Sequence, residues 1–211
     1  AYNYDRSLDS HMMKNTEWGA VAYLSHSKYG INQEIRKNNS STYITGCSAS
    51  VVNGSAYNGC ENEYNTSIGV LASTTGNISG IYDMSGGARE YMASYREYAL
   101  GSSGFDASSI ALYDSKYFDI YKFATTSYDN RILGDATGEL GPFYAYKDSD
   151  NSMRYHSTWG ADNADFVDSS NTPWFSRGGN YAFGVVAGSF AFSAGTGDAY
   201  RYFSFRLVLA D

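Results

Sequence analysis

The carboxy-terminal block, residues 174–209, constrains the fold more than any other stretch of the chain. It opens with WFSRGG and closes with SFRLVL, and between them lie Gly, Ala, Ser and aromatic residues with almost no charge. Residues 202–209 are rich in aromatic and branched side chains, which predicts a buried strand. The Arg-Gly-Gly run predicts a tight turn into another strand, because glycine adopts backbone angles that other residues resist. Regular ends thus frame an irregular middle, the kind of segment that carries a binding surface.

Length and composition favour a single globular domain spanning residues 1–211. Hydrophobic residues make up 43% of the chain and charged residues 18%, so the chain should fold. It holds 22 glycines, 21 tyrosines and only 2 prolines, which indicates many short strands and turns. The formal charge of −7 argues against nucleic acid or an anionic membrane as partner. We find no apolar run long enough to span a bilayer.

Cys47 and Cys60 are the only cysteines, in a polar stretch rich in Gly, Asn and Ser. A disulfide closing this loop would fit an extracellular protein and contribute about 3 kcal/mol. Two unpaired thiols in a cytosolic protein are the alternative. No signal peptide is visible and Ala1 is not a natural start, so we expect a processed or trimmed chain that lacks its natural amino-terminal part.

Local patterns predict few helices and several short strands. Asn15-Thr16-Glu17 is typical of a helix start, and Trp18, Val21, Ala22 and Leu24 then form one apolar helical face that ends near Gly30. The other expected elements are a strand-like piece at 42–45, a short strand at 68–73, a short helix or extended segment at 90–98 and a loop at 99–115. They continue with a strand within 116–126, turns at 134–141, an aromatic segment at 142–146, a segment at 154–159 that pairs into the sheet, and an acidic, solvated loop at 161–171.

Four motifs in order resemble those of the formylglycine-generating enzyme (sulfatase-modifying factor) family. Residues 80–91, GIYDMSGGAREY, are similar to that family's signature Gly-Leu-Tyr-Asp-Met-x-Gly-Asn-Val-Trp-Glu-Trp. Residues 16–18 are similar to its Glu-Ala-Glu-Trp-Glu helix, residues 177–179 to its Arg-Gly-Gly-Ser turn, and residues 204–206 to its terminal Gly-Phe-Arg. The resemblance covers most of the chain.

The resemblance implies an α+β fold: the C-type lectin-like fold in its formylglycine-generating-enzyme variant, with few helices, a small twisted antiparallel sheet and much irregular loop. It also implies a set of structural residues, in which the two carboxylates accept backbone hydrogen bonds and the two arginines hold the sheet. These residues are Trp18, Asp83, Glu90, Trp174, Arg177, Gly178, Gly179 and Arg206.

The departures from the family argue against its oxidase chemistry. The catalytic enzymes carry paired cysteines just after the Arg-Gly-Gly turn to bind copper, whereas residues 180–206 here contain no Cys, His, Glu or Lys. Without a thiolate or imidazole there is neither a soft-metal site nor a nucleophile. The signature's Asn-Val-Trp is replaced by Gly87-Ala88-Arg89, so local packing must differ there. The family's opening strand and first helix have no counterpart before Met13.

Other catalytic or metal sites find little support. His11, His26 and His156 are scattered, and His26 is interpreted as a cap or surface residue near a helix end. Asp162, Asp165 and Asp168 lack the ligand spacing of a dedicated calcium loop, and the sugar-binding motifs of calcium-dependent lectins are absent. We therefore expect no catalytic residue, no metal site and no cofactor.

The carboxy-terminal block resembles a narrower group, the variable proteins of diversity-generating retroelements, which display hypervariable residues on this fold. Their template adenines are rewritten, often in Asn codons ending in a pyrimidine. Lys, Glu, Gln, Met and Trp, which such codons cannot encode, are absent from residues 175–209. The open positions of the scaffold, expected to bind ligand, are Ala182, Phe183, Val185, Val186, Ala191, Ser193, Ala194, Thr196, Asp198, Tyr200, Arg201 and Tyr202.

These positions have the composition of a paratope, because Tyr and Phe give contact area at low entropic cost while Ser, Ala and Thr adapt. The alternative is that Phe183, Val185, Val186 and Tyr200 belong to the core. We expect a non-enzymatic ligand-binding or adhesin domain on a cell surface, pilus or phage particle, with a protein or cell-surface ligand. An enzyme of the oxidase family with relocated chemistry and a structural subunit of a surface appendage are the alternatives.

Overall fold

The computed structural model describes residues 1–40, 62–123, 143–157, 159–167 and 169–210, and shows an α+β fold with few helices and several small sheets. The pair Cys47 and Cys60, the strand-like piece at 42–45 and the turns at 134–141 lie outside the described residues. None of the described helices is long and apolar enough to cross a membrane.

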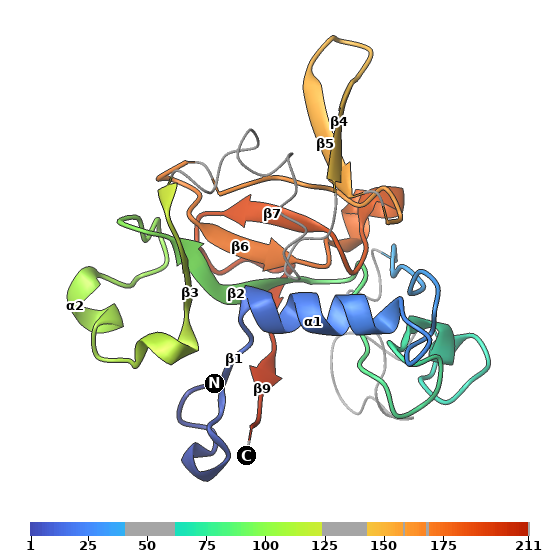
Figure 1. Cartoon of the computed structure of the whole chain (residues 1–211), viewed down its shortest axis with the longest axis horizontal. Coiled ribbons are helices and arrows are strands. Elements are labelled where there is room, and N and C mark those ends of the chain that lie inside the picture. Colours follow the sequence, from blue (N-terminus) through green and yellow to red (C-terminus); the bar gives the residue numbers. More distant parts are fainter. Residues whose placement is uncertain (41–61, 124–142, 158, 168, 211) are drawn as a thin grey trace.

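A five-stranded sheet forms the centre of the molecule (Figure 1). Its long strand is β2 (Arg89–Arg96), which pairs antiparallel with β6 (Trp174–Arg177), and β6 pairs antiparallel with β7 (Phe192–Gly195). The other edge of β2 is shared by two short parallel strands, β8 (Phe203–Phe205) at its start and β3 (Asp119–Tyr121) at its end. Residues 90–98 therefore begin in a strand, the extended alternative of the two predicted.

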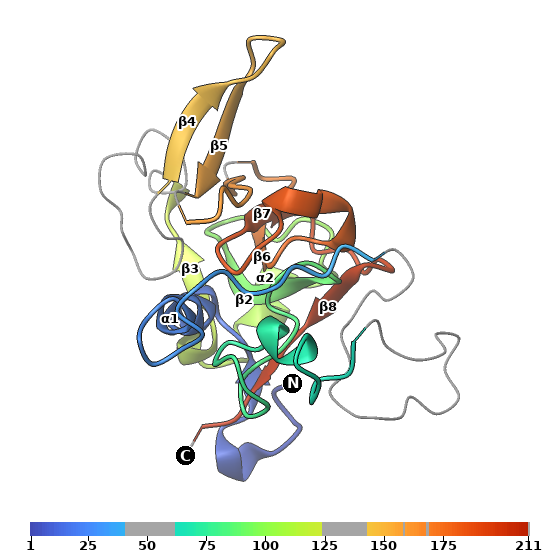
Figure 2. The same ribbon diagram turned by 90° about the vertical axis from the view of Figure 1, so that its right-hand side faces the viewer.

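The final segment is split between two sheets, so the prediction of one buried strand at 202–209 was wrong. After β8, the strand β9 (Leu207–Val208) leaves the central sheet and pairs antiparallel with β1 (His11–Met12). The change occurs at Arg206, whose side chain turns inward while its carbonyl accepts from the Met13 amide at 2.9 Å. Both chain ends consequently lie together at one side of the molecule (Figures 1 and 2).

Helix α1 (Asn15–Ser25) confirms the predicted helix, although it ends at Ser25, before Gly30. Trp18 and Ala22 are fully buried against the sheet, whereas Leu24 is 57% exposed. Leu24 therefore does not belong to the buried face. His26 is the residue that caps the helix end, as expected, and its ring packs against Phe190.

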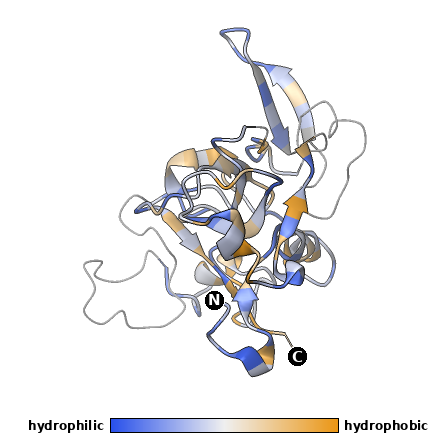
Figure 3. Cartoon of the chain, turned by 90° about the vertical axis from the view of Figure 1, so that its left-hand side faces the viewer, coloured by the Kyte–Doolittle hydropathy of each residue, from blue (hydrophilic) through white to orange (hydrophobic). Residues whose placement is uncertain are grey.

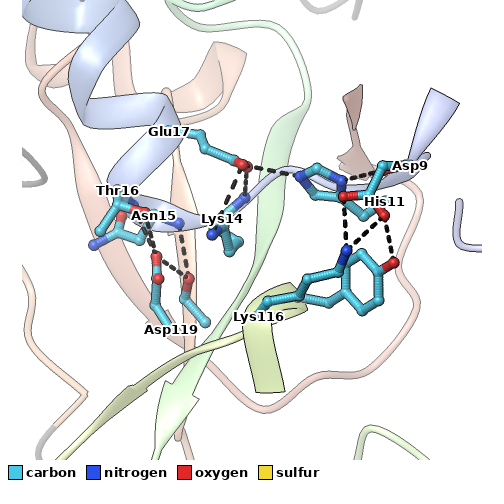
Figure 4. A network of polar contacts seen from close by, with 10 residues as sticks. Asp9, His11, Lys14, Asn15, Thr16, Glu17, Lys116 and Asp119 are labelled. Atoms are coloured by element: carbon cyan, nitrogen blue, oxygen red, sulfur yellow. Dashed lines mark hydrogen bonds and ion pairs between the residues drawn. The ribbon is translucent and has the colours of Figure 1, made fainter. Parts of the chain in front are cut away.

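A polar network pins the start of α1 to neighbouring segments (Figure 4). The Glu17 carboxylate accepts from the Lys14 amide at 2.8 Å and bonds the His11 ring at 2.9 Å. The Asp119 carboxylate accepts from the backbone and hydroxyl of Thr16 at 2.8 and 3.0 Å. Because these contacts satisfy donors of the first helical turn, the network is structural.

The aromatic core lies between α1, the central sheet and a loop before β6. Its fully buried side chains include Trp18, Met84, Met92, Phe166, Val167, Phe175, Phe190 and Phe192. Phe166 and Val167 come from the segment 161–171, so the prediction of a solvated loop there was wrong. That segment packs on β7, where the Asp165 amide donates to the Phe192 carbonyl at 3.1 Å and Ala164 forms a bridge with Phe192.

Three further expectations are changed by the structure. Residues 68–73 form a 3₁₀ helix, Gly69–Ala72, and the expected loop at 99–115 contains the short helix α2 (Ala107–Ile110). The aromatic segments form β4 (Phe143–Lys147) and β5 (Met153–Ser157), a separate hairpin that projects from the body (Figures 1 and 2). Figure 3 shows this hairpin in mostly hydrophilic colours, which explains why it stays outside the core.

We predict that Trp18→Ala lowers the free energy of unfolding by about 3–5 kcal/mol, because it removes a fully buried aromatic side chain. Leu24→Ala, on the same helix but exposed, should change it by no more than about 0.5 kcal/mol. Urea unfolding of the two variants measures both values. Equal losses would contradict this account of the helix.

Candidate binding surface

Arg177 ties the helix, the sheet and the loop before β7 together. The side chain is fully buried at the end of β6 and donates to the Asn15 amide oxygen at 2.9 Å and to the Ser189 carbonyl at 3.3 Å. The same carbonyl accepts from the Trp18 indole at 2.7 Å. The Arg177 guanidinium also lies 5.9 Å from the Trp18 ring centre. One arginine thus connects three segments far apart in the sequence.

The predicted Arg-Gly-Gly turn follows directly and is confirmed, but the strand expected after it is wrong, because the turn leads into the 3₁₀ helix Tyr181–Val186. Gly178 and Gly179 have φ angles of 82° and 66°, a region that favours glycine. The Gly178 amide donates to the Ala191 carbonyl at 3.2 Å, and its carbonyl accepts from the Gly86 amide at 2.9 Å. The turn therefore joins the sheet to residues 84–88.

Arg206 is the second arginine that holds the sheet, and it does so through Glu90. We call Arg177, Arg206 and the segments that they bond the frame. The Arg206 Nε donates to Glu90 Oε2 at 2.9 Å, a second nitrogen contacts Oε1, and that nitrogen also donates to the Tyr82 carbonyl at 2.9 Å. Burial raises the pKa of Glu90, and the bonds from Arg206 oppose that rise. The expectation that Glu90 accepts backbone hydrogen bonds was wrong, since its partner is the Arg206 side chain. Asp83 lies half-buried nearby, with a left-handed φ of 61°.

Trp174 begins β6 and lies opposite Tyr95 of β2. Its side chain is buried, and its indole donates to the Leu100 carbonyl at 2.9 Å. Its ring lies 4.9 Å from that of Tyr95. Trp174 is thus a packing residue, as predicted.

Most of the predicted open positions lie on two surface segments. The first is the 3₁₀ helix Tyr181–Val186, where Val185 is 82% exposed and Ala182 is also exposed. The second is the loop 196–202, where Tyr200 is 57% exposed. We call these two segments the display segments. Their other members are exposed Asp198 and Arg201 and half-buried Phe183, Val186, Thr196 and Tyr202.

Two positions were placed wrongly on the surface. Ala191 is fully buried, because it follows the turn at Gly188 and its carbonyl faces the Gly178 amide inside the frame. Ser193 is buried in β7, where its hydroxyl accepts from the Asn163 side chain at 3.1 Å. Ala194, between the buried positions of β7, is half-buried. The alternative that Val185 and Tyr200 belong to the core is also wrong, since both are exposed.

The display segments meet at Arg89, the first residue of β2. The Tyr181 amide donates to the Gly87 carbonyl at 2.8 Å, and the Arg89 amide donates to the Tyr202 carbonyl at 3.0 Å. The Arg89 guanidinium lies 4.5 Å from the ring centre of Phe183 and 5.2 Å from that of Phe203. Arg89 was not among the predicted site residues. The sequence clue to Arg89 is that the formylglycine-generating-enzyme signature, which residues 80–91 resemble, has Trp at this position.

Asp162 and Lys37 fix the base of the 3₁₀ helix. Lys37 contacts the Asp162 carboxylate at 3.3 Å and also donates to the Val185 carbonyl. Asp162 accepts from the Phe190 amide at 3.0 Å and is 1% exposed. Burial raises the pKa of Asp162 to about 7, although Lys37 opposes the rise. An acidic residue expected in a solvated loop is therefore a buried anchor.

No cluster of three or more His, Cys, Asp or Glu able to hold a metal ion occurs among the residues that the structure describes. His11, His26 and His156 lie in separate environments, bonded to Glu17, the Ala22 carbonyl and Tyr146 respectively. Asp168 lies outside the described residues, so the acidic trio can be compared only at Asp162, which is buried, and Asp165, which is exposed.

No protein-family model matches the chain, and a search of curated proteins finds no match either.

We predict that Asp162 makes stability depend on pH. Because its folded-state pKa is raised from 3.8 to about 7, the folded protein keeps a proton between these values that the unfolded chain loses. Stability should therefore fall as pH rises from 4 to 7, by at most about 4 kcal/mol, and level off above. Urea unfolding between pH 5 and pH 8 measures this slope.

Asp162→Asn should flatten that slope, so the variant gains stability relative to the wild type as pH rises. Asp198→Asn, which removes an exposed carboxylate from a display segment, is the matched control and should leave the slope intact. An unchanged slope in Asp162→Asn would contradict the assignment.

Proposed function

We propose that this chain is a ligand-binding domain of the adhesin type, a variable protein of a diversity-generating retroelement with the C-type lectin-like fold of the formylglycine-generating-enzyme variety. Its display segments carry interchangeable residues that recognise a protein or cell-surface ligand, with the domain presented on a cell surface, pilus or phage particle. The proposal is supported by the α+β architecture, by the four sequence motifs and by the exposure of most of the open positions.

The observation that carries the proposal is how the display segments are attached. Tyr181, Val185, Val186 and Tyr202 are bonded to the rest of the molecule through backbone atoms: the partners are the Gly87 carbonyl, Lys37, the Asn163 amide and the Arg89 amide. Backbone bonds do not depend on side-chain identity. The exposed side chains can therefore change while the attachment stays the same.

The internal bonds of the frame likewise come from residues outside the display segments. Arg177 bonds Asn15 and Ser189, and Arg206 bonds Glu90 and the Tyr82 carbonyl. Substitutions at the display positions leave these bonds untouched. A rigid scaffold with substitutable exposed side chains is the arrangement of antibody-like binders.

The chemistry of the exposed side chains also favours protein recognition. Tyr200 and Tyr202 lie 4.6 Å apart between ring centres, and Tyr202 lies 5.4 Å from Phe203. Aromatic rings held in this way offer contact area with little rotamer entropy to lose on binding. Val185 adds an exposed apolar contact on the other segment.

We predict that the triple variant Val185→Asn, Tyr200→Ser, Arg201→Ser keeps its free energy of unfolding within about 1 kcal/mol of the wild type, because exposed substitutions cost little. Ala191→Leu, a buried position of the same block, should cost about 1–3 kcal/mol through overpacking. Chemical unfolding compares the two variants. A collapse of the triple variant would contradict the proposal.

Binding is tested with a library displayed on yeast, in which Ala182, Val185, Asp198, Tyr200 and Arg201 are randomised. Selection on purified streptavidin should yield binders that lose binding when the original five residues are restored. A matched library randomised at five exposed positions outside the display segments should yield none. A folded display library without binders would speak against these segments as the recognition surface.

A further inference from the structure

A pocket of about 320 Å³ opens where the first display segment meets residues 154–156 and 163–165. Arg89 and Phe183 line it together with Ser193, and Arg154, Asn163 and Asp165 line it from the opposite segment. Phe183, a half-buried display residue, and Ser193, buried in β7, thus form its wall. The pocket is part of the proposed recognition surface.

Arg89 is the unusual group in this pocket. Among the described residues its guanidinium has no hydrogen bond or ion pair, and its Nε is buried without a partner. Its guanidinium packs on the rings of Phe183 and Phe203, which limit its movement. Burial lowers the pKa of Arg89, and a buried unpaired donor costs free energy that a bound acceptor would recover.

The other polar groups of the pocket are largely committed to protein partners. Arg154 donates to Asp148 at 2.7 Å, and both ring nitrogens of His156 are bonded, to the Ala161 carbonyl and the Tyr146 hydroxyl. Asn163 donates to the Phe192 carbonyl and to Ser193 Oγ. Asp165 is the acidic residue among those that line the pocket, and its negative charge raises the pKa of Arg89.

Ser193 can add a second donor beside Arg89. Its oxygen accepts from Asn163 at 3.1 Å, so its hydroxyl proton remains available to a bound acceptor. A planar guanidinium and a hydroxyl donor on one wall suit a carboxylate, which accepts at two oxygens. The apolar wall at Phe183 suits the methylene carbons that carry such a carboxylate.

We propose that this pocket binds the carboxylate of an acidic side chain, Glu or Asp, on a protein partner. The proposal rests on the proposed function and names the ligand chemistry of that site. A protein side chain is favoured as the source because Phe183 and Tyr155 line the pocket beside Arg89, and aromatic contacts of this kind are typical of protein-binding paratopes.

The test uses N-acetyl-glutamate-N-methylamide as the probe and the corresponding glutamine compound as its neutral isostere. Each is titrated into the ¹⁵N-labelled full chain at constant ionic strength, and the arginine Nε–Hε resonances are followed. We expect saturable shifts of the Arg89 signal with the glutamate probe and at least about tenfold weaker binding of the glutamine compound, since one charge-assisted bond is worth about 1.5–3 kcal/mol. This comparison needs no variant.

Variants then assign the site. Arg89→Gln should weaken binding of the glutamate probe about tenfold or more, whereas Arg201→Gln, an exposed arginine of the display segments outside this pocket, should leave it unchanged. The melting temperature of each variant confirms that it is folded. Ser193→Ala should weaken binding less than Arg89→Gln does.

Equal binding of the two compounds, or no saturable shift, would overturn the proposal. Saturable binding of glucuronate without binding of the glutamate probe would overturn the assignment to a protein side chain. Because this titration does not exchange the display residues, its failure leaves the recognition function to the library experiment. Failure of the library alone would instead reduce the site to an isolated carboxylate pocket.

Discussion

The buried Arg177 guanidinium is the interaction on which the rest of the structure depends. It carries a charge into the core, where it bonds the first residue of α1 and the loop that precedes β7. A charge in this position is costly unless it is bonded on several sides, so the segments that bond it must be in place together. The helix, the Arg-Gly-Gly turn and the approach to β7 are thereby coupled. The display segments begin directly after this coupled unit.

Sequence patterns predicted the frame better than the surface it holds. Trp18 on a helix and the positive-φ glycines at 178 and 179 followed from side-chain type and spacing, and the structure agrees. The burial of Ala191 and Ser193 could not be predicted in the same way, because small residues fit equally well inside and outside a fold. It depends on which side of the turn at Gly188 they fall, which is a long-range property.

Other errors had the same origin in tertiary contacts. Asp162 lies in a polar, acidic stretch, and only the approach of Lys37 and the Phe190 amide makes it a buried anchor. The segment 202–209 has the composition of one strand, but Arg206 points inward to Glu90 and the strand pairing changes at this residue, which divides the segment into β8 and β9. Arg89 stands where the signature that residues 80–91 resemble has Trp, and its contacts with the Phe183 and Phe203 rings depend on the fold.

The pairing of β1 with β9 has a mechanical consequence. His11 lies opposite Val208 and Met12 opposite Leu207, and the Ala210 amide reaches the Leu8 carbonyl, so both chain ends leave from the same end of this short ribbon. Because hydrogen bonds in an antiparallel pair run across the strands, tension between the two ends peels them open one after another instead of loading them at once. Under a stretching force the β1–β9 pair would therefore open before the central sheet does. On the carboxy-terminal side, the next contact to carry the force is the ion pair between Arg206 and Glu90.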